Sequence, residues 1–223
     1  MRKLRTLGLC ICCILVLAGA SFGASRQEKK SLSIFLSNFT EAGLFNFDIR
    51  TYADEGEDEL EGETPLHLGI PNNVTELARF GIVHNLINNY GSRIKKCRDR
   101  NCESGPLVID KKFVAESVRK YFGFDLDAMD LSPIQDSPSV VYSYDGRLYH
   151  FDAESFGEPD NDTVYYAEVE DVDEGRYITA SGYIYDTKRP SVRKGTFSAF
   201  VIPSKWRGKD SWLIVSMSTE WSR

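Results

Sequence analysis

The sequence has 223 residues, of which 27 are basic and 33 are acidic, so its formal net charge is −6. A chain of this length with 42% hydrophobic residues has enough apolar side chains for one sizeable core. The acidic balance argues against nucleic acids and anionic membrane surfaces as partners, because both carry negative charge themselves.

The first 24 residues have the pattern of a secretory signal peptide. Basic residues within the first five positions precede an apolar run from residue 7 to about 20, and the small residues that follow predict cleavage after Ala20 or Gly23. The run is shorter than the ~20 apolar residues that a membrane-spanning helix needs. Ala20 stands where a lipoprotein signal has its cysteine, so no lipid anchor is expected. We therefore expect a secreted or periplasmic protein whose mature net charge is 24 − 33 = −9.

Removal of the signal leaves two of the five cysteines, Cys97 and Cys102. In an oxidising compartment this pair predicts a disulfide that closes a short loop. A redox pair is the alternative, because flanking basic residues lower a thiol pKa, although the usual spacing there is Cys-x-x-Cys. The histidines His67, His84 and His150 lack metal-ligand spacing, so neither a metal nor a cofactor is predicted.

Residues 25–71 are predicted to form an N-terminal extension. Apolar and aromatic side chains in 32–39 and 44–47 indicate a segment packed on the domain, either as an irregular helix or as an edge strand. Residues 54–63 contain seven carboxylates, which predicts a solvated run. This run lacks the alternating ligands and central glycine of a calcium loop.

The first convincing helix begins at Asn73, whose side chain can cap it with Glu76 as the capping-box partner. Its apolar stripe has three- and four-residue spacing and extends to about residue 96. The stripe contains Leu77, Phe80, Gly81, His84, Ile87, Tyr90 and Ile94. Gly91 is a position at which this helix can bend or end.

A second helix is predicted after the cysteine pair, from a cap at Asp110 to a left-handed stop at Gly123. Its buried side is predicted to consist of Phe113, Val114, Val118, Tyr121 and Phe122. The stretch 125–138, with two prolines and four aspartates, then marks the change to an extended pattern.

The rest of the chain predicts strands. Asp145-Gly146 between two short runs, 140–144 and 147–151, predicts a two-residue hairpin turn in which both residues have positive φ. Three later runs alternate apolar and polar residues, with longer loops expected at 186–195 and 204–210. Their predicted buried faces are Ile178, Ala180, Gly182 and Ile184; Phe197, Ala199 and Val201; and Leu213, Val215 and Met217.

These elements predict an α+β domain over residues 72–223, with two N-terminal helices covering the apolar face of a curved five- to six-stranded antiparallel sheet. This order resembles the cystatin-like and nuclear-transport-factor-2-like cone. The segments Phe-Leu-Ser-Asn-Phe-Thr-Glu at 35–41, Leu-Ala-Arg-Phe-Gly-Ile-Val-His-Asn at 77–85 and Lys-Tyr-Phe-Gly at 120–123 are similar to uncharacterised secreted proteins and lipoproteins of bacteria. That family has no assigned activity, so the resemblance implies no functional residues.

The first functional hypothesis is an exported, non-catalytic domain that binds a partner protein or a small ligand. Tyr177, Tyr183 and Tyr185 fall on one face of a predicted strand, and Trp212 is expected to continue that face. Such side chains bury a large area and keep a polar group, which suits an interface. The simpler interpretation is that tyrosine is a good strand former on a half-exposed face.

The second hypothesis is a small acid/base enzyme of isomerase or hydrolase type with a pocket between helix and sheet. His84 and His150 are its candidate catalytic residues, with Tyr142 or Tyr149 as hydrogen-bond donors. A lone histidine in an apolar stripe, as at His84, is more often a hydrogen-bonded core residue. We therefore prefer the binding hypothesis.

Overall fold

The structure is a computed structural model that describes residues 24–50, 66–67, 74–98, 102, 105–129, 131, 134, 141–156, 164–174 and 177–222. The helices in this part are α1 (Arg26–Glu41), α2 (Val74–Arg93) and α3 (Lys111–Phe122), with short 3-10 turns η1 (Leu126–Ala128) and η2 (Ala153–Phe156). The predicted signal and the acidic run at 54–63 lie outside the described residues, apart from Ala24.

Within the described residues, ten strands form two sheets rather than the single sheet predicted. The large sheet has the order β2-β1-β10-β9-β8-β7, and the small sheet has the order β3-β4-β6-β5. The strands are β1 (Phe47–Asp48), β2 (Leu66–His67), β3 (Ile94–Lys96), β4 (Leu107–Asp110), β5 (Tyr142–Tyr144), β6 (Leu148–Phe151), β7 (Tyr165–Glu174), β8 (Ile178–Asp186), β9 (Arg189–Trp206) and β10 (Lys209–Trp221). All pairings are antiparallel except β1 with β2.

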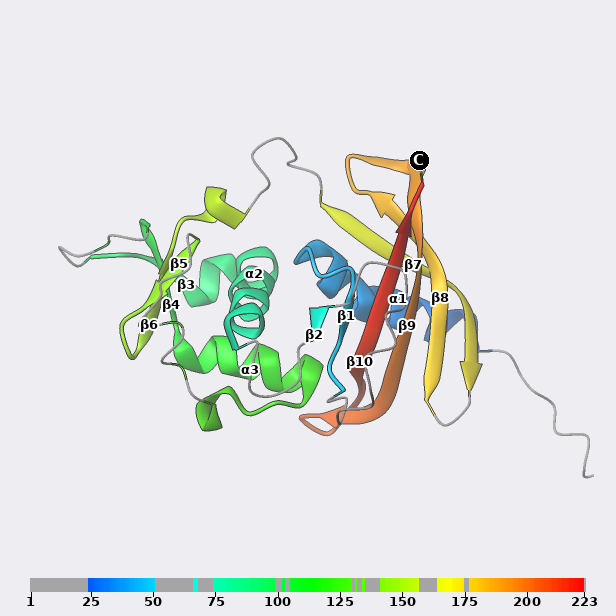
Figure 1. Ribbon diagram of the computed structural model, residues 1–223, viewed down its shortest axis with the longest axis horizontal. Helices are drawn as coiled ribbons and strands as arrows, with labels where there is room; N and C mark the ends of the chain where they lie inside the picture. Colours follow the sequence, from blue (N-terminus) through cyan, green and yellow to red (C-terminus); the bar gives the residue numbers. More distant parts are fainter. Residues whose placement is uncertain are drawn as a thin grey trace, which may run out of the picture.

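The α+β class is thus confirmed, in a layered arrangement. Figure 1 shows the small sheet on one side, α2 and α3 in the middle, and the large sheet with α1 on the other side. The segment predicted as an N-terminal extension contributes α1 and β1 to the same core as the rest, through Leu32, Phe35, Phe39 and Phe47.

The large sheet consists mainly of consecutive hairpins whose turns are tighter than the sequence suggested. Arg207 and Gly208 have φ values of 50° and 78°, which fits the two positive angles of a type I′ turn between β9 and β10. A turn at 187–188 joins β8 to β9. The loops predicted at 186–195 and 204–210 are therefore wrong, because the strands continue almost to each turn.

The predicted buried faces of β8 and β9 are confirmed, with Ala180, Ile184, Ala199 and Val201 fully buried. The face predicted for β10 is confirmed at Val215 and Met217, which are buried, and wrong at Leu213, which is only half-buried. A register shift between Ile214 and Ser216 inserts one extra residue, so the alternation moves by one position. The core cluster therefore contains Ile214 and Met217, with Trp212 packed against it, and Val215 is buried outside this cluster.

Helix α1 is the element that packs along the large sheet, a place that the prediction gave to the helix beginning near residue 73. Its apolar stripe is Leu32, Phe35, Leu36 and Phe39, all buried. This three- and four-residue spacing makes the segment a regular helix rather than an edge strand. Ser25 caps it by accepting a hydrogen bond from Glu28 N at 3.2 Å.

Helix α2 packs instead against α3 and the small sheet. Gly81 allows a close helix contact, since a Cβ there would lie 2.7 Å from Val114 Cγ1 and 2.9 Å from Val114 O. The helix is interrupted at Asn89 (φ −138°), and residues beyond Arg93 form β3, so the predicted continuation to residue 96 is wrong. Ile87 and Tyr90, predicted to be buried, are 43% and 52% exposed.

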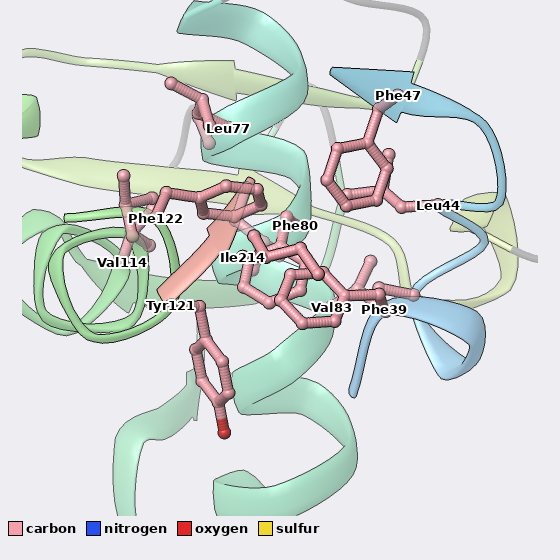
Figure 2. Packing of buried hydrophobic residues seen from close by; sticks show 14 of the residues in the cluster. Phe39, Leu44, Phe47, Leu77, Phe80, Val83, Val114, Tyr121, Phe122 and Ile214 are labelled. Atoms are coloured by element: carbon pink, nitrogen blue, oxygen red, sulfur yellow. The ribbon is translucent and has the colours of Figure 1, made fainter. Parts of the chain in front are cut away.

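Helix α3 follows its prediction closely. Asp110 accepts a hydrogen bond from Lys112 N at 3.0 Å, and Gly123 ends the helix in the left-handed conformation at φ 77°. Figure 2 shows Phe122 from α3 among the apolar side chains of α2 and the N-terminal segment, while the hydroxyl of Tyr121 is directed away from the cluster. Phe39 lies at the centre, with five rings within 5.8 Å between centroids: Phe35, Phe47, Phe80, Tyr121 and Phe122.

The predicted hairpin around Asp145-Gly146 exists, but its turn is displaced by one residue and it belongs to the small sheet. Tyr144 pairs with Tyr149, and Asp145 N donates to Leu148 O at 3.1 Å. The central residues of the turn are therefore Gly146 and Arg147, and only Gly146 has positive φ (96°). Strand β6 then pairs with β4, which draws the hairpin into a separate sheet.

Candidate functional site

The two candidate histidines lie in different parts of the molecule. His84, on α2, stacks on Phe80 with ring centroids 6.0 Å apart and meets Tyr121 edge-on at 4.9 Å. Burial, with the positive charges of Lys120 and Arg93, lowers the pKa of His84 to about 4. Its hydrogen-bond partner within the described chain is the Asn88 amide, at 3.2 Å, and not a carboxylate. His84 is therefore a neutral residue of the aromatic core.

His150 lies on β6, on the face of the small sheet that is turned away from the core. Its Nε2 is 2.8 Å from Asp145 Oδ2, and its Nδ1 is 3.7 Å from Cys97 Sγ. The predicted hydrogen-bond donors point to the opposite face, where Tyr142 and Tyr149 are fully buried in the core. The histidines and tyrosines thus do not assemble into a pocket between helix and sheet.

The predicted tyrosine surface is only partly present. Tyr183 and Tyr185 share one face of β8, but Trp212 lies on the core face of β10, 5.8 Å from Phe35 between ring centroids. Tyr177 precedes β8 and is half-buried.

Contacts with neighbouring strands occupy the tyrosines of β8. Tyr166 stacks on Tyr185 with centroids 5.3 Å apart, and the Arg193 guanidinium lies 3.1 Å from the Tyr183 ring centroid. Both β8 tyrosines are half-buried. They pack against side chains of the neighbouring strands, which fits the simpler interpretation that these tyrosines are strand formers on a half-exposed face.

A groove runs along α1. Its volume is about 920 Å³, within the range typical of ligand sites. One wall is α1, the other is β7, and Asn88 of α2 closes part of it. Lys29 and Lys30 lie among its lining residues toward one end of α1, and Glu41 lies toward the other.

A second hollow of about 290 Å³ adjoins the groove on the other side of α1. It has an aromatic lining to which Phe35, Tyr121, Trp206 and Trp212 contribute. Both hollows share Ile34 and Asn38. Ile34 is 62% exposed, so this apolar side chain stands in solvent between them.

The contact between α1 and β7 is made by a stripe of polar side chains on the helix. Strand β7 is the edge strand of the large sheet, and backbone groups on its free edge form hydrogen bonds with side chains of α1 instead of with another strand. Ser33 Oγ accepts from Val169 N at 2.9 Å, and Ser37 Oγ accepts from Ala167 N at 3.0 Å. Thr40 Oγ1 donates to Tyr165 O at 2.9 Å, and Lys29 Nζ donates to Glu170 O.

This match has a geometric cause. Four residues of helix rise ~6.0 Å, and two residues of strand rise ~6.6 Å, so hydroxyls at every third or fourth helix position meet alternate strand residues. The stripe closes the free edge of β7 against a further strand. A ligand in the groove therefore contacts side chains and does not extend the sheet. The signal for this contact in the sequence is the spacing of the hydroxyl residues Ser33, Ser37 and Thr40.

The second hollow contains a partly desolvated cation. Lys120 Nζ donates to the Tyr121 hydroxyl at 2.9 Å. Burial, together with nearby Arg93 and Arg207, lowers the pKa of the Lys120 ammonium more than Glu116 raises it. Burial also raises the pKa of the Tyr121 hydroxyl, so the phenol stays neutral. An anionic group beside Lys120 would relieve the cost of burying this charge.

The charge of the lining differs from that of the whole chain. Five cations line the two hollows, namely Arg26, Lys29, Lys30, Lys120 and Lys209, against three carboxylates, namely Glu41, Glu168 and Asp210. Burial raises the pKa of Glu41, which favours its neutral form. A protein with a formal charge of −6 thus has a locally basic groove.

No three histidine, cysteine or carboxylate side chains of the described ranges come together as metal ligands. Within the same ranges, no helix combines the length and apolar character needed to cross a membrane.

The fold and the groove define an α+β protein with two sheets, a helical middle layer and an open site beside its first helix. In comparisons with known proteins, no family model, curated protein or solved structure matches the chain. The similarity to uncharacterised secreted bacterial proteins stays a prediction.

Proposed function

We propose that this protein is an exported, non-catalytic binding domain, and that it binds a ligand with an apolar body and an anionic group in the two hollows around Ile34. The observation that carries the proposal is the exposed Ile34 between an aromatic hollow and a groove with a basic lining. The alternative acid/base enzyme has less support, because His84 is neutral within aromatic packing and His150 faces away from the groove.

Each part of the site has a role in this proposal. Trp206, Trp212 and Phe35 offer apolar surface for the body of the ligand. Lys120 offers a charge that is incompletely solvated, and opposite charges attract more strongly where water is partly excluded. Together these groups favour an anionic amphiphile over a neutral or cationic one of the same shape.

Three ligands with the same ten-carbon chain test the proposed charge preference: decanoate, decanol and decylamine. The fluorescence of Trp206 and Trp212 reports binding, and calorimetry gives the affinity. We expect decanoate to bind at least about tenfold more tightly than the other two, which corresponds to ~1.4 kcal/mol. Equal affinity for all three, or no binding by any, contradicts the proposal.

A matched pair of variants tests the location. Ile34→Glu places a carboxylate between the hollows, whereas Ile87→Glu changes another exposed isoleucine that lines neither of them. We expect Ile34→Glu to weaken decanoate binding at least about tenfold by repulsion and loss of apolar contact, and Ile87→Glu to leave it unchanged. Both variants should melt near the wild-type temperature, because both positions are exposed.

Export and the cone architecture are parts of the same proposal. Cell fractionation with N-terminal sequencing tests export, and the expected mature protein begins at Ser21 or Ala24. Recovery of the full-length chain in the cytoplasm contradicts it. The cystatin-like or nuclear-transport-factor-2-like arrangement is supported by an N-terminal helix followed by the antiparallel meander β7 to β10.

A further inference from the structure

The strongest feature outside the groove is the disulfide between Cys97 and Cys102, which lies beside His150. Three groups form a chain: Cys97 Sγ is 3.7 Å from His150 Nδ1, and His150 Nε2 is 2.8 Å from Asp145 Oδ2. A sulfur, an imidazole and a carboxylate in this order match the general pattern of an activated thiol. We propose that Cys97–Cys102 is a redox-active disulfide, in which Cys97 is the reactive thiolate after reduction and His150 is its proton acceptor.

The fold itself depends little on this disulfide. It lies within the β3–β4 hairpin, whose strands already pair at Ile94 with Ile109 and at Lys96 with Leu107. Cys97 N also donates to Pro106 O at 2.8 Å. The bridge spans a sequence separation of five, so it closes a loop that the sheet already holds closed. Stabilisation by a crosslink is small when the loop is short.

The imidazole of His150 is positioned for proton transfer. The Asp145 carboxylate favours the tautomer with the proton on Nε2, which leaves the Nδ1 lone pair facing sulfur. Asp145 is in turn held by Arg147 N and Leu148 N, which donate to Oδ1 at 2.8 and 2.7 Å. Burial alone would raise the pKa of Asp145, but these hydrogen bonds and the one from His150 keep it below the ordinary value.

The surroundings also favour a thiolate. Register places Lys95, Val108, His150 and Ser143 in one row across the four strands, with Cys97 beside Lys95 at the end of β3. Among the described residues, the charged groups of this region are Asp145 in the β5–β6 turn, Lys95 and Lys96 on β3, Arg98 after Cys97, and Asp152 after β6. Cations near a cysteine lower its pKa, and both cysteines are half-exposed and thus open to a reactant.

The exchange requires an external dithiol. One thiol of that dithiol loses its proton to solvent, and its thiolate attacks Cys97 Sγ to form a mixed disulfide. The Cys97–Cys102 bond breaks, and Cys102 leaves with the electron pair and takes up a proton from solvent. The second thiol of the donor gives its proton to His150 Nδ1 and attacks its own sulfur in the mixed disulfide, which releases Cys97 as a thiolate beside protonated His150. The donor is oxidised to a disulfide, the protein disulfide is reduced to two thiols, and the reverse sequence reduces a disulfide substrate.

Two single-cysteine variants identify the reactive thiol. Cys102→Ser leaves Cys97 beside His150, and Cys97→Ser leaves Cys102 as its matched control. Alkylation by iodoacetamide is followed between pH 5 and 10 at each cysteine of the full chain by mass spectrometry, so the other cysteines do not interfere. We expect half-maximal reactivity of Cys97 at least about one pH unit below that of Cys102. Equal profiles overturn the proposal.

The positioning groups are tested in the Cys102→Ser background. His150→Gln removes the proton acceptor and should return the Cys97 profile to that of an ordinary thiol. Asp145→Asn keeps an oxygen for the turn and should shift the profile part of the way. Ser143→Ala, on the neighbouring strand, should leave it unchanged. A profile that His150→Gln does not move assigns the disulfide a structural role only and overturns the proposal.

Equilibration of the wild-type chain with glutathione provides the redox measurement. We expect His150→Gln to favour the disulfide at least about tenfold relative to wild type, because the reduced state loses its paired thiolate. Circular dichroism of the reduced wild-type protein should retain the native spectrum. Loss of that spectrum on reduction would show that the bridge is needed for folding, which also overturns the proposal.

Discussion

The strands of the two sheets are paired in different ways. In the large sheet, β7 to β10 follow one another along the chain and pair with their neighbours through tight turns. In the small sheet, strands of three or four residues come from two segments on either side of α3, and β4 pairs with β6 rather than with the next strand in sequence. Long local hairpins are visible as alternating patterns, whereas short strands that pair across a helix are not.

The layer of α2 and α3 is the part on which both sheets depend. It lies between them in Figure 1, and its aromatic side chains belong to a core that contains residues from both sheets. Damage to this layer should therefore affect the whole molecule, whereas changes confined to the small sheet should have modest effects. The following predictions test that difference, from the largest effect to the smallest.

The largest effect is expected from Gly81→Val in α2. Even the first side-chain carbon would lie within 3 Å of Val114 of α3, including its backbone oxygen, so the helices must separate. We expect a loss of ~3 kcal/mol in the free energy of unfolding, measured by urea denaturation. Gly91→Ala is the control in the same helix, where nothing lies within 4 Å of the new carbon, and should stabilise by up to ~1 kcal/mol. Equal effects at both positions contradict the helix contact.

The second effect is acid sensitivity through His84. Its pKa is about 4 in the folded protein and 6.5 in the unfolded chain, so between these values the unfolded chain binds more protons. Stability contributed by the neutral imidazole is therefore complete above pH 6.5 and is lost as the pH falls toward 4. We expect wild type to lose ~2 kcal/mol more than His84→Gln between pH 7 and pH 5. Parallel losses in urea titrations of the two proteins contradict this assignment.

A smaller effect is expected when the disulfide of the small sheet is reduced. Loop entropy predicts a loss of at most ~2 kcal/mol for so short a ring, and the β3–β4 ladder persists without the bridge. Urea denaturation with and without a phosphine reductant measures the difference. A loss of more than ~4 kcal/mol would falsify the view that the hairpin holds itself closed, since loop entropy alone cannot supply it.

The smallest effect is expected from Tyr149→Phe, also in the small sheet. The Tyr149 hydroxyl is buried without a hydrogen-bond partner among the described residues, so its removal should stabilise the protein by ~1 kcal/mol. Tyr142→Phe is the matched control, because the Tyr142 hydroxyl donates to Thr75 O at 2.7 Å. That variant should lose ~1 kcal/mol. Thermal unfolding of both variants distinguishes the signs, and a loss at Tyr149 contradicts the orphan hydroxyl.

Much of the candidate site was beyond sequence reasoning. The sequence pointed to Tyr183 and Tyr185 for binding, but cross-strand partners such as Tyr166 and Arg193 occupy these rings. Ile34, an exposed apolar residue of the groove, lies in a helix in which Leu32 and Phe35 are buried, and periodicity alone did not establish that helix. His150 was a candidate by residue type, but its carboxylate neighbour Asp145 lies in the β5–β6 turn, and its sulfur neighbour depends on the pairing of β4 with β6.

Local patterns in the sequence determined the cap and stop of α3, the inward faces of β8 and β9, and the disulfide loop. Each depends on residues close together in the chain, whose spacing sets which side chains share a face. Only the tertiary structure decided that the strands divide into two sheets, that α1 closes the edge of β7, and that a bulge shifts which side chains of β10 face the core. These features depend on contacts between segments that are distant in the chain. The entropy lost in bringing such segments together, and the free energy gained by packing them, depend on both partners and cannot be inferred from either segment alone.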